Sequence, residues 1–165
     1  MPIVINGTTF NNGGTAIFNG QTVKEIKFNT TTVWKAELVL FENGRFQNGV
    51  TNTFRYGNKH SIDGVYLKIS NYENLQRETN TVNLRSIIDL SQYTRLVFVK
   101  YDGGYCKVGL TDYVGTYGST TFVVGVDSAI GDNVLDISGL NPSGHYYLNF
   151  QMNNSTCRFS KIYLA

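Results

Sequence analysis

The 165-residue sequence contains few of the residues that mark several common classes of protein. It has two cysteines, two prolines and two histidines, and two cysteine sulfurs cannot by themselves form a structural zinc site. No stretch approaches the roughly 18 to 20 consecutive apolar residues that a membrane-spanning helix needs. The N-terminus also lacks the cationic and apolar segments of a signal peptide. The sequence therefore predicts neither a membrane span nor export by a signal peptide of its own.

Charge of either sign is scattered along the chain. Lysine and arginine number 14 and aspartate and glutamate 12, which gives a formal charge of +2, and no run of like charges exceeds two residues. A protein that neutralises a phosphate backbone carries a basic stripe. Because none is present, nucleic acid is not an expected partner.

Apolar and polar residues alternate along most of the chain, as they do in half-buried antiparallel strands. In one segment Val65, Leu67 and Ile69 share a face, and Tyr66 and Lys68 share the other. Asn-Gly and Asp-Gly pairs separate such segments at the spacing of a sandwich. No window shows a helical repeat, so at most one helical turn is expected, within residues 86–93. The sequence predicts an all-β fold, an antiparallel β-sandwich of the jelly-roll type.

The first 36 residues form very short apolar segments that are separated by turns. They begin with Ile5-Asn6-Gly7, turn again at Asn19-Gly20 and close with Val33-Trp34-Lys35. In this pattern the segment resembles the N-terminal part of tail and tail-tip proteins of prophages in Gram-positive bacteria. The resemblance implies a small β-hairpin module, residues 1–36, that docks the protein on a virion. Other virion proteins would then be partners, and the virion would be its location.

Residues 37–165 form the second predicted domain. An apolar-Asp-apolar-Ser segment at 135–138, a Gly-His-Tyr-Tyr segment at 144–147 and an apolar C-terminal segment at 157–164 resemble the galactose-binding-like jelly roll. That resemblance implies a jelly-roll domain. It leaves the ligand open, because such domains serve as sugar binders and as structural pieces alike.

Residues 96–99 are apolar on both faces of their strand. Such a strand lies at the centre of a covered sheet or at a subunit contact. Tail-tip receptor-binding proteins are usually trimers, so the resemblance and this strand together predict a homotrimer.

The two cysteines fall in phase with core positions of their strands, Cys106 with Val108 and Cys157 with Phe159. Both thiols should therefore point into the core. In a reducing cytoplasm, where a virion protein is assembled, they are expected to stay free rather than to form a disulfide.

No arrangement of residues predicts catalysis. His60 and Asp63 lie in one short segment, where they cannot converge with a nucleophile as a triad requires. Asp127, Asp132 and Asp136 flank a bend and could offer oxygens to Ca²⁺, but their spacing matches no known calcium loop, which favours turn residues. We expect a protein without enzymatic activity, cofactor or metal.

Tyrosine is abundant on faces that should lie outside the core. Its ring can cover the C–H face of a sugar and its hydroxyl can bind the polar edge, while neighbouring lysine and asparagine side chains bind sugar hydroxyls. Alternatively, the rings cover a half-exposed sheet or lie between subunits. The candidate ligand-binding residues are Tyr66, Lys68, Tyr105, Lys107, Tyr113, His145, Tyr147 and Asn149.

The leading hypothesis is a non-catalytic phage tail-associated protein that binds a cell-surface saccharide through its jelly roll. One alternative is a purely structural virion component, of the baseplate or a decoration, without a ligand. The other is a stand-alone carbohydrate-binding module.

Overall fold

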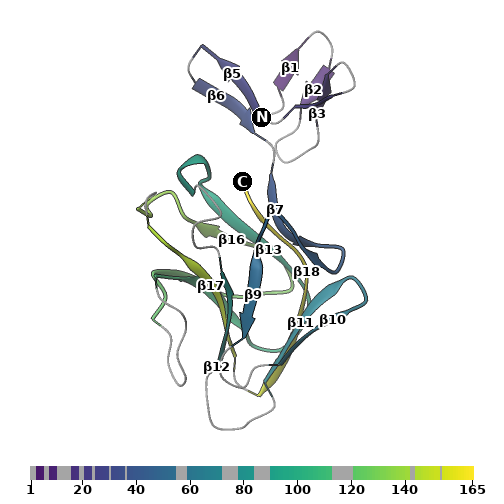
Figure 1. Ribbon diagram of the computed structural model, residues 1–165, viewed down its shortest axis with the longest axis vertical. Coiled ribbons are helices and arrows are strands. Elements are labelled where there is room, and N and C mark those ends of the chain that lie inside the picture. The colour runs from purple at the N-terminus through teal and green to yellow at the C-terminus, as the bar shows by residue number, and fades with distance from the viewer. Residues whose placement is uncertain are drawn as a thin grey trace. The chain divides into compact units, whose positions relative to one another are not determined.

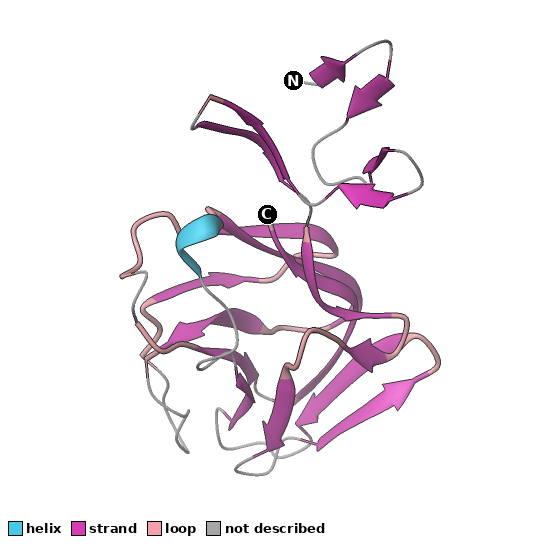
Figure 2. Ribbon diagram, turned by 45° about the horizontal axis from the view of Figure 1, so that its top comes forward, coloured by secondary structure: helices cyan, strands magenta, loops and turns pink. Residues whose placement is uncertain are grey.

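The computed structural model describes residues 3–5, 8–10, 16–18, 21–23, 25–29, 31–35, 37–54, 59–71, 78–83, 90–112, 121–141, 144–152 and 154–165. Most of them lie in antiparallel strands, and the 3-10 turn Leu90–Gln92 is the sole helical element in this part of the chain (Figure 2). That turn lies inside the segment for which the sequence predicts it. No helix among these residues has the length and apolar character needed to cross a membrane.

The chain divides into two compact units, Met1–Leu38 with Ala165, and Val39–Leu164. Among the described residues of the first unit, each strand pairs with its neighbour in the sequence, and three hairpins result. They are β1 (Ile3–Ile5) with β2 (Thr8–Phe10), β3 (Ala16–Phe18) with β4 (Gln21–Val23), and β5 (Glu25–Phe28) with β6 (Thr31–Lys35). The hairpin structure predicted for the N-terminal segment is thus confirmed, whereas the bounds of the module, residues 1–36, and its docking role stay predictions.

The second unit contains a seven-stranded sheet built around one long strand, β18 (Ser155–Leu164). The order is β10-β11-β18-β13-β16 (Figure 1). Strand β7 also pairs with β18, and β8 pairs with β7. The other strands are β7 (Leu38–Glu42), β8 (Arg45–Phe46), β10 (Lys59–Asp63), β11 (Tyr66–Asn71), β13 (Arg95–Gly103) and β16 (Gly131–Asp136). Because β13 has partners on both sides, the strand that is apolar on both faces is a central one.

A five-stranded sheet forms the second layer, in the order β15-β14-β17-β12-β9. Its strands are β9 (Thr51–Phe54), β12 (Glu78–Asn83), β14 (Lys107–Thr111), β15 (Val124–Asp127) and β17 (Tyr147–Met152). Most of these strands are far apart in the sequence, so the sheet depends on long-range pairing.

The inner faces of the two sheets form the core. Phe150 of β17 and Phe159 of β18 meet with ring centroids 5.1 Å apart, and Phe98 of β13 lies 6.0 Å from Phe159. All three rings are fully buried. The prediction of an antiparallel β-sandwich of the jelly-roll type is therefore confirmed.

Asn-Gly turns close strand pairs as their sequence predicts. Asn43 and Gly44, between β7 and β8, have φ angles of 52° and 72°. A two-residue hairpin turn of type I′ needs a positive φ at both central residues, and asparagine and glycine tolerate it best.

Both cysteines are buried and free, as predicted. The thiol of Cys157 donates a hydrogen bond to the carbonyl oxygen of Gly104, at 3.2 Å. A hydrogen bond with the Cys106 thiol lowers the pKa of Cys157 to about 7, and burial raises the pKa of Cys106 well above its usual value. Lys100 is 3% exposed, and its ammonium group donates to the carbonyl oxygens of Gly104 and Ser128 at 2.6 and 3.2 Å.

Candidate functional site

The outer face of the five-stranded sheet carries polar residues in rows that cross the strands. Alternation along β14 and β17 turns Val108, Leu110, Leu148, Phe150 and Met152 inward, so the residues between them point outward. We call this surface the polar face, defined by Lys107, Gly109 and Thr111 of β14, Tyr147, Asn149 and Gln151 of β17, and Gly125 and Asp127 of β15. The ladders align Asp127, Lys107 and Gln151 in one row, and Gly125, Gly109 and Asn149 in the next.

The middle of the polar face is buried although its side chains are polar. Asn149 and Thr111 are completely buried and Gln151 is 5% exposed. The Asn149 amide donates to Thr111 Oγ1 at 2.5 Å and to the Tyr147 carbonyl oxygen at 3.4 Å. A buried amide without partners is costly, so these bonds both permit its burial and fix its orientation.

An aromatic ring lies over a pair of glycines on the same face. A Cβ atom added to Gly109 would overlap the ring of Phe122, and one added to Gly125 would lie 3.0 Å from Phe122 Cγ. The Lys107 ammonium lies 5.4 Å from the centroid of this ring, within reach of a cation–π interaction. Glycine in a strand interior often marks such a close approach. The two mid-strand glycines are therefore a signal in the sequence that indicates this site.

Charged and aromatic groups at one end of the polar face reach the solvent. Tyr105 is 53% exposed and its hydroxyl donates to Asp127 Oδ1 at 3.1 Å. Asp127 pairs in the ladder with Lys107. Tyr105, Asp127, Lys107 and Phe122 therefore form an accessible group, in which an exposed ring lies close to a fixed acceptor and a cation.

Four of the predicted ligand-binding residues come together here. Tyr147 and Asn149 lie on the polar face but are 8% and 0% exposed, so they support the surface rather than form its outermost layer. Lys107 is half-buried and Tyr105 is exposed. His145 precedes β17 and is exposed, and Tyr113 lies outside the described residues.

Tyr66 and Lys68 occupy the other sheet. They belong to β11, which pairs with β10 and β18, and the neighbouring core residues Leu67 and Ile69 point inward. Tyr66 and Lys68 therefore point away from the sandwich on the side opposite the polar face, and the structure does not bring them together with Lys107 or Tyr105.

Two of the acids considered for Ca²⁺, Asp127 and Asp136, have other contacts. The Asp136 carboxylate accepts hydrogen bonds from the Ser138 amide at 2.9 Å and the Ser138 hydroxyl at 2.6 Å. These bonds lower the pKa of Asp136 below its usual value, as expected for a carboxylate that caps a turn. In the part of the chain that the structure describes, no group of three or more His, Cys, Asp or Glu side chains is arranged to hold a metal ion.

Solved structures with a similar fold are carbohydrate-binding modules of family 29. A point mutant of the module CBM29-2 matches with a TM-score of 0.54 and 16% identity over 79% of this chain and 91% of its own. A second mutant module of family 29 gives a TM-score of 0.53 at 16% identity, over 78% and 90% of the two chains. A further CBM29-2 mutant, complexed with mannohexaose, gives 0.51 at 18% identity, also over 78% and 90%. No protein-family model matches the sequence, and no curated protein does. At this identity the similarity shows the fold, a jelly-roll sandwich like that of these modules.

Proposed function

We propose that residues 39–164 form a non-catalytic saccharide-binding module whose ligand lies on the polar face. The observation that carries the proposal is the group of Lys107, Asp127, Tyr105 and Phe122 at the accessible end of a row of fixed polar side chains. Saccharide recognition uses apolar ring surface for C–H groups and oriented polar groups for hydroxyls. The proposal is also supported by the similar fold of family 29 modules, one of which was solved with mannohexaose.

Pre-organisation favours binding at this face. Asn149 is held by Thr111, and Tyr105 and Asp127 hold each other, so few side-chain rotamers have to be fixed when a ligand binds. A cation and an anion that face each other in one row suit the vicinal hydroxyls of a neutral sugar, because one group donates hydrogen bonds and the other accepts them. We expect a neutral oligosaccharide as the ligand class.

Affinity electrophoresis tests this function. The protein should migrate more slowly in native gels that contain a neutral polysaccharide it binds, with mannan as the first polysaccharide of a panel. The Lys107→Ala variant should be retarded clearly less, since a hydrogen bond to a charged group contributes about 1.5–3 kcal/mol, or at least about tenfold in the affinity of this site. Arg45→Ala is the matched control, because it removes an exposed cation from β8, outside the five-stranded sheet. Equal retardation of both variants would reject the polar face as the site.

We also propose that the protein is attached to a phage tail. Its support is the pattern of turns in residues 1–36 and the Val33-Trp34-Lys35 close, which resemble prophage tail proteins. On this proposal the hairpin unit docks on a virion and the protein is a homotrimer that meets a cell-surface glycan. Light scattering behind a sizing column tests the trimer, and a species of 18.4 kDa at tens of micromolar would contradict it. A purely structural virion component would show no retardation with any polysaccharide of the panel.

A further inference from the structure

The outer face of the seven-stranded sheet carries a stacked pair of tyrosines. The rings of Tyr66 on β11 and Tyr101 on β13 have centroids 4.3 Å apart and planes within 22° of parallel. Strand β18 runs between these two strands, so the rings meet above it. In the antiparallel ladder Leu67 pairs with Phe159, so the next residue of β18, Ser160, lies opposite Tyr66. A small side chain at this position leaves room for both rings, and Tyr101 remains 53% exposed.

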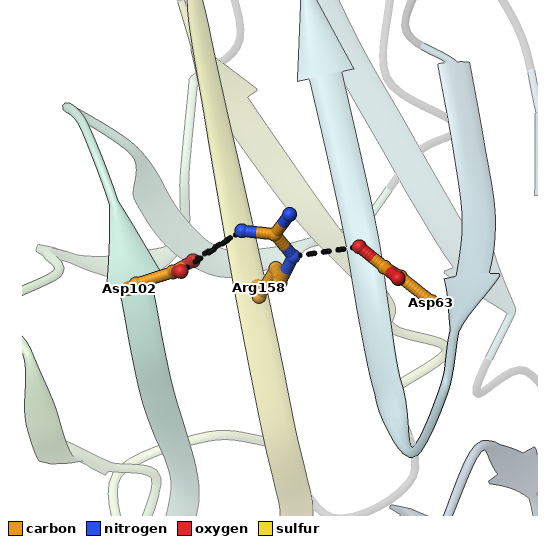
Figure 3. A network of polar contacts seen from close by, with 3 residues as sticks. All are labelled: Asp63, Asp102 and Arg158. Atoms are coloured by element: carbon orange, nitrogen blue, oxygen red, sulfur yellow. Dashed lines mark hydrogen bonds and ion pairs between the residues drawn. The ribbon is translucent and has the colours of Figure 1, made fainter.

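An arginine clamped by two carboxylates lies on the same face, two residues along β18 from Ser160. Arg158 Nε donates to Asp63 Oδ2 of β10 at 2.8 Å, and its Nη1 donates to both oxygens of Asp102 of β13 at 2.8 and 3.1 Å (Figure 3). Three strands thus hold one guanidinium plane. The charge-assisted bonds keep the pKa of Asp63 below its usual value, with hydrogen bonding to Arg158 as the main cause.

Arg158 and Asp63 each have one side-chain atom left that can form a further hydrogen bond beside the rings. Within the described residues, Arg158 Nη2 and Asp63 Oδ1 make no hydrogen bond, and Figure 3 shows the Nη2 atom directed away from both carboxylates. A fixed donor and a fixed acceptor therefore lie on either side of the Nε–Oδ2 bond. Lys68 occupies the same ladder row as Arg158 and adds a second cation.

The charges of these residues balance. Asp63 and Asp102 are negative, and Arg158 and Lys68 are positive, so the set has no net charge and gives no electrostatic preference for an acidic or a basic ligand. Ion pairs with side chains that are 30–46% exposed contribute little to stability. The stability of the fold therefore depends little on these ion pairs. A neutral ligand with an apolar face and closely spaced hydroxyls fits the arrangement.

We propose that Tyr66, Tyr101, Arg158, Asp63, Asp102 and Lys68, the tyrosine–arginine cluster, form a second binding surface for a neutral saccharide. A sugar ring stacks on the exposed face of Tyr101, and its hydroxyls accept from Arg158 Nη2 and donate to Asp63 Oδ1. The ligand class rests on the proposed function of the polar face, and the location is independent of it. Because the two surfaces are on opposite outer faces of the sandwich, the protein binds two segments of polysaccharide at once, which strengthens attachment to a multivalent surface.

Amide chemical shifts of the full-length chain, recorded by NMR during titration with mannohexaose, test the second surface. The expected result is two groups of shifting amides, one around residues 105–111 and 147–151, the other around 63–68, 101–103 and 158. Tyr101→Ala and Arg158→Gln should each abolish the second group and leave the affinity of the first unchanged within about twofold. Val65→Ala is the matched control, since Val65 is 49% exposed and lies beside Tyr66, and it should leave both groups intact.

The other outcomes separate the two proposals. Shifts confined to the polar face would overturn the second surface and leave the proposed function standing. Shifts confined to the tyrosine–arginine cluster would confirm the second surface and overturn the polar face as a site. A spectrum that does not change with mannohexaose or with any other neutral oligosaccharide of a panel would overturn both. Retained dispersion of the amide spectrum in each variant shows that a lost response is not a loss of folding.

Discussion

The two outer faces of the sandwich differ in how their polar groups relate to the solvent. On the polar face Asn149 and Thr111 are completely buried and bonded to each other. In the tyrosine–arginine cluster the polar groups stay partly exposed, with the side chains of Arg158 and Asp63 30% and 46% accessible. The polar side chains of the first face are therefore packed within the fold, whereas those of the tyrosine–arginine cluster lie on its surface.

Because of this difference, substitutions on the two faces should affect folding stability to different degrees. A buried amide that loses its partner leaves an unsatisfied group behind, so a change in the middle of the polar face should weaken both folding and ligand binding. An exposed ion pair is largely compensated by water. Changes in the tyrosine–arginine cluster should therefore alter binding with little effect on folding.

The largest effect on stability is expected from a substitution in the core between the two sheets. Phe150→Ala deletes a ring that packs against Phe159 between the sheets, and a buried Phe→Ala change costs about 3–5 kcal/mol of unfolding free energy. Urea denaturation measures this loss. Val134→Ala, at a residue that is 51% exposed, should stay within about 0.5 kcal/mol of the unchanged protein. A loss below about 1 kcal/mol for Phe150→Ala would mean that these rings do not join the two sheets.

An intermediate effect is expected at the glycine pair of the polar face. In Gly109→Ala the new methyl group would overlap Phe122 and the backbone of β15, and overpacking of this kind costs about 1–3 kcal/mol. Gly139→Ala is the control, because a Cβ atom at Gly139 meets no atom within 4 Å. Thermal unfolding should separate the two variants clearly. If both melt at the same temperature, Phe122 does not lie on the glycines in solution.

The smallest effect on stability is expected in the tyrosine–arginine cluster and should depend on pH. The pKa of Asp63 is lowered in the folded state by its hydrogen bond to Arg158, so this carboxylate stabilises the fold above its usual pKa. The contribution is lost as the pH falls through the lowered value. Melting temperatures of the unchanged protein and Arg158→Gln should therefore differ slightly at pH 6, and the difference should shrink as the pH falls through the lowered pKa of Asp63. A difference that grows towards acid pH would contradict this coupling.

The alternation of residues predicted much of the fold. It assigned Leu67 and Ile69 to the core and predicted that Cys106 and Cys157 are buried, because a strand imposes a period of two whatever its partners are. The Asn43-Gly44 hairpin was also predictable locally, because asparagine and glycine tolerate the positive φ angles of its turn. These features depend on neighbours in the sequence only.

The composition of the candidate site was harder to predict, since it depends on pairing between distant segments. Tyr66 and Tyr147 both alternate outward, but β11 pairs with β18 and β17 pairs with β14, which places them on opposite faces. Burial of Asn149 by hydrogen bonding, and contact of Tyr66 with Tyr101 across β18, likewise have no local signature. Glycines in mid-strand at 109 and 125 are a local signal of a close approach.

Calorimetric titration with mannohexaose, run in parallel on the unchanged protein, Lys107→Ala and Arg45→Ala, tests the central claim most directly. We predict that Arg45→Ala binds the oligosaccharide as the unchanged protein does, and that Lys107→Ala loses at least about tenfold in affinity for the site on the polar face. The melting temperatures of the variants show that both remain folded. Identical affinities for all three proteins would contradict the claim that the polar face binds the saccharide.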